Sequence, residues 1–344
     1  MSGPARDDRD DRAPWHEGRR HAIHQIVDAT RQLPEARREA LTVMRAFEAG
    51  TLAERPPDRP LRGMVIVNEL IALEAIEAAK AYARSGIHGA ADVDGLELLT
   101  IALEHLPPAA AGMPFRDDTA RDFQLVRHPD PGRRPLILVF CGLAQRFAMP
   151  LNLAHRWFAR LGAHVAYLRD LRRAYYLAGI QSLGQDYAAS CAALRDVARS
   201  LDASGIVCVG NSAGTFGALS LGLDLQAAGV LCLSGPTRLD QSRADVERSF
   251  AAAGMSIATV PPEHFDLRQR FALTPRRPRV RHVHGAGNDV DRSEGENLAG
   301  IAGVELLPIA GWERHSVVEA LIPSGAFDGH LRWLVGTTAA GTAG

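Results

Sequence analysis

The sequence I-V-C-V-G-N-S-A-G-T-F-G-A-L occupies residues 206–219 and decides the fold of this 344-residue chain. Its first four residues are apolar and predict a buried strand, whereas the small residues from Ala213 onward continue at helical spacing. The motif G-x-S-x-G lies between them, at Gly210, Asn211, Ser212, Ala213 and Gly214. At such a strand-to-helix turn the serine is strained and its hydroxyl rises above the sheet edge. Both glycines are expected because a Cβ would collide with the crossing strand or helix.

The composition excludes several classes of partner. The formal net charge of −1 gives no global field that would attract nucleic acid or an anionic membrane, so neither is predicted as a partner. Residues 1–14 are polar and predict a disordered tail, and no apolar run reaches the ~18 residues of a membrane span, which predicts a cytoplasmic protein. The four cysteines lack metal-ligand spacing and are expected as reduced core residues, and no metal or cofactor is predicted.

Residues 15–112 show helical periodicity and are predicted to form a helical accessory domain. One expected helix carries Leu41, Met44 and Phe47, and a long one runs through 70–76. Four residues of this region have side chains that can bind metal: His21, His24, Glu69 and Glu74. Such residues are common on the solvated faces of amphipathic helices, which explains them better than a metal site does. A proline- and charge-rich stretch at 114–119 marks the boundary to the next domain.

Beyond this boundary, apolar strand-like runs alternate with helical segments, which predicts a mostly parallel sheet with helices on both faces. The expected strands begin at Phe123, Pro135, His164, Ile206, Val230, Arg279 and Val304. Residues 120–336 resemble the α/β-hydrolase family in the G-x-S-x-G turn, the upstream strand ending in F-C-G, an acidic loop after a later strand and a histidine after the last one. The resemblance implies a catalytic domain over 116–338, with a small lid at about 236–278.

The resemblance also implies a serine, acid and histidine in that chain order. A serine hydroxyl needs a base, and His315 follows the final strand where the family has its general base. The sequence offers two candidates for the acid that would orient His315, Asp289 and Asp291. The family's spacing from the strand-end glycine favours Asp289, and Asp291 with Glu294 three residues later suggests a helix N-cap in a capping box.

The oxyanion hole implied by the resemblance combines the backbone N–H groups of Ala213 and Leu143. Cys141 stands where many relatives have histidine, and a thiol nucleophile there would lack the strand-to-helix turn. The resemblance therefore predicts a serine hydrolase that cleaves a carboxylic ester or thioester through an acyl-enzyme on Ser212. An acyltransferase with the same acyl-enzyme and a non-catalytic binding protein on this fold stay as alternatives.

The expected substrate is a small acyl compound, with CoA- or carrier-protein-linked acyl groups among the candidates; the oligomeric state stays open. The lid segment carries several aromatic residues that either line an acyl pocket or pack the lid on the core. An arginine-rich sector that includes Arg169, Arg172 and Arg173 is expected on the catalytic side. A solvated surface explains it better than recognition of an anionic substrate does.

Overall fold

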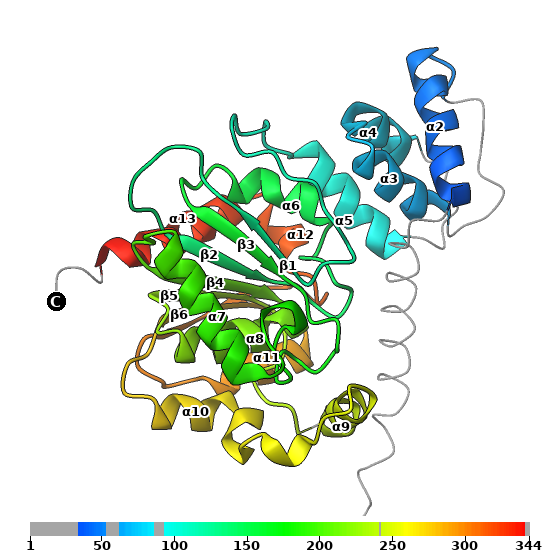
Figure 1. Ribbon diagram of the computed structural model, residues 1–344. Helices are drawn as coiled ribbons and strands as arrows, with labels where there is room; N and C mark the ends of the chain where they lie inside the picture. Colours follow the sequence, from blue (N-terminus) through cyan, green and yellow to red (C-terminus); the bar gives the residue numbers. More distant parts are fainter. Residues whose placement is uncertain (1–33, 53–61, 86–92, 241, 341–344) are drawn as a thin grey trace, which may run out of the picture. The chain divides into compact units, whose positions relative to one another are not determined.

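The computed structural model describes residues 34–52, 62–85, 93–240 and 242–340 (Figure 1). Contacts divide the chain into two compact units, Met1–Leu96 and Glu97–Gly344. The division precedes the predicted boundary at 112–116. Met113, inside that predicted boundary, lies in the second unit, where its carbonyl oxygen is 2.9 Å from Nε2 of the buried His155. The predicted tail at 1–14 lies outside the described residues.

In the first unit, the described residues form α2 (Pro34–Glu48), α3 (Arg62–Ala72), α4 (Ile76–Arg84) and the start of α5 (Val93–Glu104). Apolar side chains of α3 and α4 are buried, among them Val67, Leu70 and Tyr82. The prediction of one long helix through 70–76 is wrong. Glu74 has a positive φ of 59°, which right-handed helical residues do not adopt, and it separates α3 from α4.

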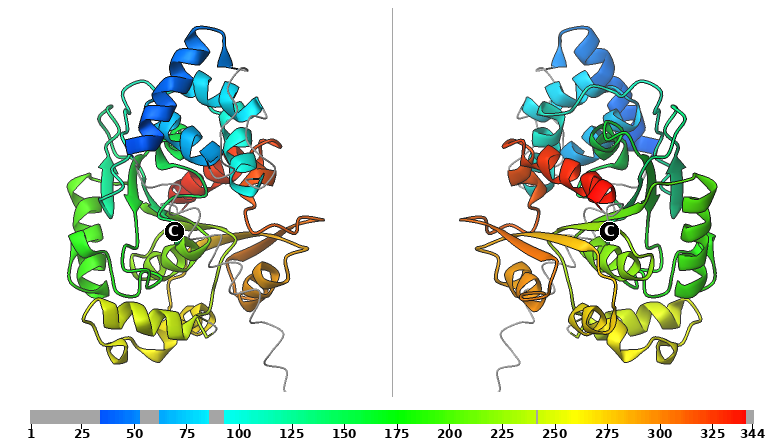
Figure 2. Two further views of the ribbon diagram at one scale, coloured as in Figure 1. Left: turned by 90° about the vertical axis from the view of Figure 1, so that its right-hand side faces the viewer. Right: turned by 90° about the vertical axis from the view of Figure 1, so that its left-hand side faces the viewer.

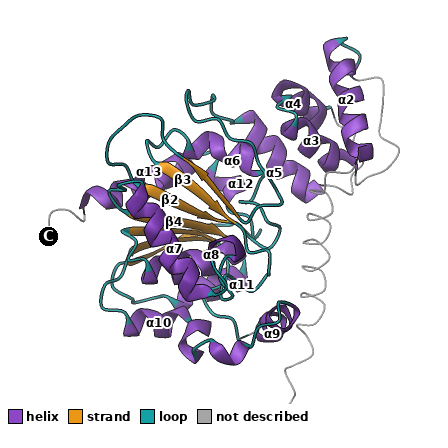
Figure 3. Cartoon of the chain, viewed as in Figure 1, coloured by secondary structure: helices purple, strands orange, loops and turns teal. Residues whose placement is uncertain are grey.

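A seven-stranded sheet forms the centre of the second unit (Figure 3). Its order is β1-β3-β2-β4-β5-β6-β7, in which only β1 pairs antiparallel with its neighbour. The strands are β1 (Phe123–Val126), β2 (Leu136–Phe140), β3 (His164–Leu168), β4 (Ile206–Asn211), β5 (Gly229–Leu233), β6 (Arg279–Gly285) and β7 (Val304–Ile309). Every residue of β2, β3 and β5 is buried, and all but His164 of β3 belong to continuous apolar runs, as expected for parallel strands covered on both faces.

Helices cover both faces of this sheet, which confirms the predicted architecture (Figure 2). The helices α6 (Leu151–Phe158) and α13 (Ala326–Ala340) lie on one face, whereas α7 (Tyr187–Ser200), α8 (Ala213–Asp224) and α11 (Asp289–Asn297) lie on the other. A short α12 (Val318–Leu321) precedes α13. Because β2 to β7 are parallel, the loops that follow them emerge at the same edge of the sheet, where α/β proteins place their sites.

The segment predicted as a lid contains α9 (Arg243–Ala252), two short 3₁₀ turns (Ile257–Thr259 and Pro262–Phe265) and α10 (Leu267–Leu273). Its aromatic side chains Phe250, Phe265 and Phe271 are buried in the core cluster that includes residues of α7 and α8. Of the two roles considered for these aromatics, the structure therefore favours packing of the segment on the core.

Candidate active site

The G-x-S-x-G motif at residues 210–214 forms the strained strand-to-helix turn that the sequence predicts. Ser212 has φ 52° and ψ −130° between the end of β4 and the start of α8, a backbone conformation that non-glycine residues rarely adopt. A Cβ on Gly210 would lie 2.3 Å from the Gly214 carbonyl oxygen, and one on Gly214 would lie 2.2 Å from the Phe140 carbonyl oxygen of β2. The expected collisions with helix and strand are both confirmed, so this turn admits only glycine at the two positions.

His315, in the segment after β7, lies between a serine and a carboxylate. Its Nε2 is 2.9 Å from the Ser212 Oγ, and its Nδ1 is 2.8 Å and 2.9 Å from the two carboxylate oxygens of Asp291. The Asp291 side chain is buried, whereas the imidazole is partly exposed. Three residues separated by up to 103 positions in the chain thus form one hydrogen-bonded series at the carboxyl ends of β4, β6 and β7.

The preference for Asp289 as the partner of His315 is wrong. Asp289 is the first residue of α11, its side chain is 86% exposed, and its Oδ1 accepts a hydrogen bond of 2.5 Å from Arg292. Asp291 stands two residues further along, which is a rotation of roughly 200° around the helix. That rotation turns Asp291 toward the sheet while Asp289 faces solvent.

The expected capping role of Asp291 is wrong as well. Asn288 is the N-cap of α11, and its Oδ1 accepts a hydrogen bond of 3.1 Å from the Asp291 N–H. Glu294 does not complete a capping box, because its Oε2 accepts hydrogen bonds from the Thr237 and Arg238 N–H groups. The Asp291 carboxylate is directed to the imidazole of His315.

Arg314, immediately before His315, fixes the segment that carries the imidazole. Its guanidinium lies 2.7 Å from the Glu97 carboxylate and 2.8 Å from the largely buried carboxylate of Glu319, and it stacks 4.7 Å above the Trp312 ring. Two carboxylates and one aromatic ring thus hold the residue next to His315. This restricts the positions that His315 can adopt.

The two backbone donors predicted for an oxyanion hole are both free. In the described part of the chain, no hydrogen-bond acceptor is bonded to the N–H of Leu143 or of Ala213. Ala213 is the first residue of α8, where helical N–H groups have no partner in the helix. Gly142 brings the other loop close, since a Cβ there would be 3.3 Å from the Ser212 Cβ.

Two further groups in the loop after β2 set its electrostatics. Burial raises the pKa of the Cys141 thiol to about 12, so a thiolate nucleophile is not formed there at neutral pH. Burial lowers the pKa of Arg146 to about 10, which leaves the guanidinium charged at neutral pH.

Of the three arginines named for the arginine-rich sector, only Arg169 departs from a solvated surface, whereas Arg172 and Arg173 are partly exposed. Arg169 is 1% exposed and hydrogen-bonded within the protein, and Arg172 donates to the Ala178 carbonyl oxygen at 2.6 Å. Sequence reasoning missed these internal roles, since arginine is normally a surface residue and no local pattern marks a buried one.

The described residues contain no candidate metal site. Within the ranges that the structure covers, no group of three or more histidine, cysteine or acidic side chains could hold a metal ion, and no helix has the length and apolarity to cross a membrane. Of the residues considered as ligands, His21 and His24 lie outside the described ranges. Glu69 is buried and lies 3.9 Å from Arg37.

Two buried histidines of β6 lie beneath the helix that carries Asp291. The Nδ1 atoms of His282 and His284 are 3.3 Å apart, and both residues pack against Gly295 of α11. Burial, together with the charge of His284, lowers the pKa of His282 to about 4, and burial also lowers the pKa of His284. The attraction of Asp291 opposes these shifts only in part. Both rings are therefore neutral in the folded protein at neutral pH.

These histidines predict a loss of stability in acid. An unfolded His282 titrates near 6.5, so between pH 6.5 and pH 4 the unfolded chain binds more protons and the free energy of unfolding falls as pH falls. Relative to wild type, His282→Leu should remove about 2 kcal/mol of the decrease between pH 7 and pH 5, measured by urea denaturation at both values. An unchanged difference between the two pH values would contradict a neutral buried His282.

The strand order, the single antiparallel edge strand and the elbow after β4 define an α/β-hydrolase fold. No protein-family model matches the sequence, and no curated protein matches it. Similar solved structures include an S-formylglutathione hydrolase from Agrobacterium tumefaciens, with 15% identity, 63% of this chain and 89% of that chain covered, and a TM-score of 0.43.

Two others are a hormone-sensitive lipase from a metagenome library and a thermophilic esterase from the Planctomycetes species Thermogutta terrifontis. The lipase is 14% identical with a TM-score of 0.45, over 78% of this chain and 98% of that chain. The esterase is 17% identical with a TM-score of 0.43, over 62% of this chain and 88% of that chain. Because these scores are low, the strand order and the elbow carry the fold assignment.

Proposed function

We propose that the protein is a serine hydrolase that cleaves a carboxylic ester or thioester through an acyl-enzyme on Ser212. The observation that carries this proposal is the series Asp291, His315 and Ser212, with contacts of 2.8–2.9 Å that end on a serine in the strained elbow conformation. A packing or capping role for the same residues would not require a base and a carboxylate aligned on one hydroxyl.

The arrangement assigns each group a step. His315 Nε2 takes the Ser212 hydroxyl proton as Oγ attacks the acyl carbonyl carbon, and the Asp291 carboxylate holds the Nδ1 proton and stabilises the imidazolium. The N–H groups of Leu143 and Ala213 donate to the oxyanion. The imidazolium then protonates the departing alcohol or thiol. In the second half a water molecule gives a proton to His315 Nε2 as its oxygen attacks the acyl carbon. The bond from the acyl carbon to Ser212 Oγ then breaks, and the imidazolium returns the proton to Oγ, which releases the carboxylic acid and the free serine.

The test is labelling with an activity-based fluorophosphonate probe, which reacts with an activated serine. We expect stoichiometric labelling of the wild-type protein, located at Ser212 by mass spectrometry of the labelled peptide. Ser212→Ala should not label, and prior incubation with a p-nitrophenyl ester should compete. An unlabelled wild-type protein would favour the non-catalytic alternative.

An acyltransferase shares the first half of this reaction and differs only in the acceptor. Added amines or alcohols would then divert the acyl group from hydrolysis to the acceptor. The substrate we propose is a small acyl compound, including acyl groups linked to CoA or to a carrier protein. The product ratio with and without an acceptor separates the two enzymes.

A further inference from the structure

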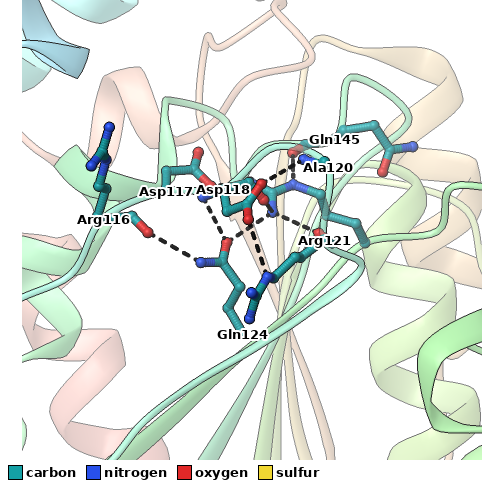
Figure 4. Close-up of polar contacts among 8 residues, drawn as sticks. Arg116, Asp117, Asp118, Ala120, Arg121, Gln124 and Gln145 are labelled. Atoms are coloured by element: carbon teal, nitrogen blue, oxygen red, sulfur yellow. Dashed lines mark hydrogen bonds and ion pairs between the residues drawn. The ribbon is translucent and has the colours of Figure 1, made fainter.

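Arg169, the residue directly after β3, has an unusual environment for a charged side chain. It is 1% exposed, and its guanidinium contacts both the segment before β1 and the loop after β2. Figure 4 labels residues from both parts, among them Asp117, Arg121 and Gln145. Its acceptors are the carbonyl oxygens of Gln145 (2.8 Å), Asp118 (3.2 Å) and Arg121 (3.0 Å), the Gln124 Oε1 (3.3 Å) and the Asp117 carboxylate. Burial of a charge costs several kcal/mol unless such partners satisfy it, so the network must form as a whole.

On the loop side, the network is attached at Gln145. Arg169 Nε donates to the Gln145 carbonyl oxygen, and the Gln145 side chain donates to the Asp170 carbonyl oxygen at 2.8 Å. Gln145 has a positive φ of 60°, a conformation that costs a non-glycine residue about 1 kcal/mol or more unless its surroundings hold it. The two hydrogen bonds thus hold a strained residue at the centre of the loop.

From Gln145 the restraint reaches the proposed oxyanion donor within the same turn. Gln145 N–H donates to the Gly142 carbonyl oxygen at 2.9 Å, and Gly142 N–H donates to the Arg146 carbonyl oxygen at 3.1 Å. Leu143 lies inside this closed turn. The loop is also fixed beyond the turn, where the Ala148 N–H donates to the Asn211 Oδ1 next to Ser212. A shift of Gln145 would therefore shift the Leu143 N–H relative to the serine.

The fork of the guanidinium explains why arginine stands here. Nε reaches the loop while the two Nη atoms reach the segment before β1, so one rigid plane joins two parts of the chain. A lysine, with a single nitrogen, would keep a charge near Asp117 but could not span both attachments. An apolar residue of similar size would form no hydrogen bond to either part of the chain.

We propose that Arg169 is a positioning residue that holds the Leu143 N–H in place as an oxyanion donor, by joining the loop after β2 to the segment before β1. The inference rests on the proposed function of Ser212. Arg169 does not touch the substrate in this proposal. Its effect is on the rate of the chemical step, because an oxyanion donor acts more strongly on the transition state than on the bound ester.

The test compares Arg169→Met with Arg270→Met. Arg270 is a matched control, since it is 5% exposed and bonds to the Ser220 carbonyl oxygen and to Asp224, near the far end of α8 from Ser212. Active sites are titrated with the fluorophosphonate probe, so that kcat for p-nitrophenyl acetate refers only to folded, reactive protein. The affinity for a trifluoromethyl ketone, which forms an oxyanion on the serine, is measured in parallel.

For Arg169→Met we expect kcat per titrated site to fall about 10²-fold with KM changed less than about 3-fold, and the ketone to bind correspondingly more weakly. Arg270→Met should lower the melting temperature and leave both quantities within about 3-fold of wild type. If Arg169→Met does not fold, Arg169→Lys decides, because it retains the charge near Asp117 and should show the same loss of kcat.

A wild-type kcat per titrated site in the folded Arg169 variant would overturn the inference, as would an equal loss in Arg270→Met. Neither result would affect the proposed function, which fails only if the wild-type protein itself is not labelled and does not turn over. The two failures are therefore distinguishable in one set of measurements.

Discussion

Replacement of Ser212 by alanine is expected to reduce ester turnover by about 10³-fold or more and to abolish covalent labelling. The alanine keeps the elbow, because the strain lies in the backbone and Gly210 and Gly214 still provide the close contacts with helix and strand. It removes the Oγ on which the proposed acyl-enzyme would form. The measurement is kcat for p-nitrophenyl esters, together with a thermal melt to show that the fold is intact.

His315→Ala serves as the companion variant. Members of a catalytic triad act as a unit, so the loss should be of similar size and the double variant should be little worse than either single one. Additive losses, or activity within tenfold of wild type in either variant, would contradict the assignment of Ser212 as nucleophile and His315 as base.

The second large effect is expected at Asp291. Asp291→Asn would offer His315 Nδ1 an amide donor in place of one carboxylate acceptor, which favours the wrong tautomer of the imidazole. By analogy with serine proteases, the expected loss of kcat is on the order of 10⁴. The measurement is kcat/KM from pH 6 to 9, with circular dichroism as a check on the fold.

Asp289→Asn is the matched control, because it makes the same chemical change two residues away in the same helical turn. The Asp289 carboxylate is exposed and pairs only with Arg292 among the described residues. Removal of an exposed pair of this kind changes stability by about 0–1 kcal/mol and should leave kcat within about 2-fold of wild type. The reverse pattern, with Asp289→Asn inactive and Asp291→Asn active, would show that the acid is Asp289 and that the contact with Asp291 is not used.

The sequence by itself determined the sheet and the elbow. Apolar runs such as Leu136–Phe140 are local signals of buried parallel strands, and the alternation with helices fixes the βαβ connections. The G-x-S-x-G motif is contiguous in the sequence, and the collision that demands glycine at 210 arises within the motif itself, with the Gly214 carbonyl oxygen. The collision at 214 involves Phe140 of the neighbouring β2 and is seen only in the tertiary structure. The sequence nevertheless displays both features, as a repeated period and as a contiguous motif.

The tertiary structure alone decided which carboxylate meets the imidazole. Asp289 and Asp291 differ by two positions, and the choice depends on where α11 begins. Asn288 acts as the N-cap, which sets the helical phase and turns Asp291 toward His315 across 24 residues of chain. A spacing rule counted from the strand-end glycine contains no information on that phase, so it favoured the exposed residue.

Contacts between residues far apart in the sequence also decided the environment of Arg169 and the unit to which the proline-rich break belongs. Arg169 has acceptors 24 to 52 residues away in the chain, and no local pattern distinguishes it from the arginines that face solvent. Likewise, the proline-rich break near Pro114 indicates a turn, whereas the contact of Met113 with His155 places that turn inside the second unit. Long-range hydrogen bonds of buried groups decide such details, and they exist only once the strands and helices have been brought together.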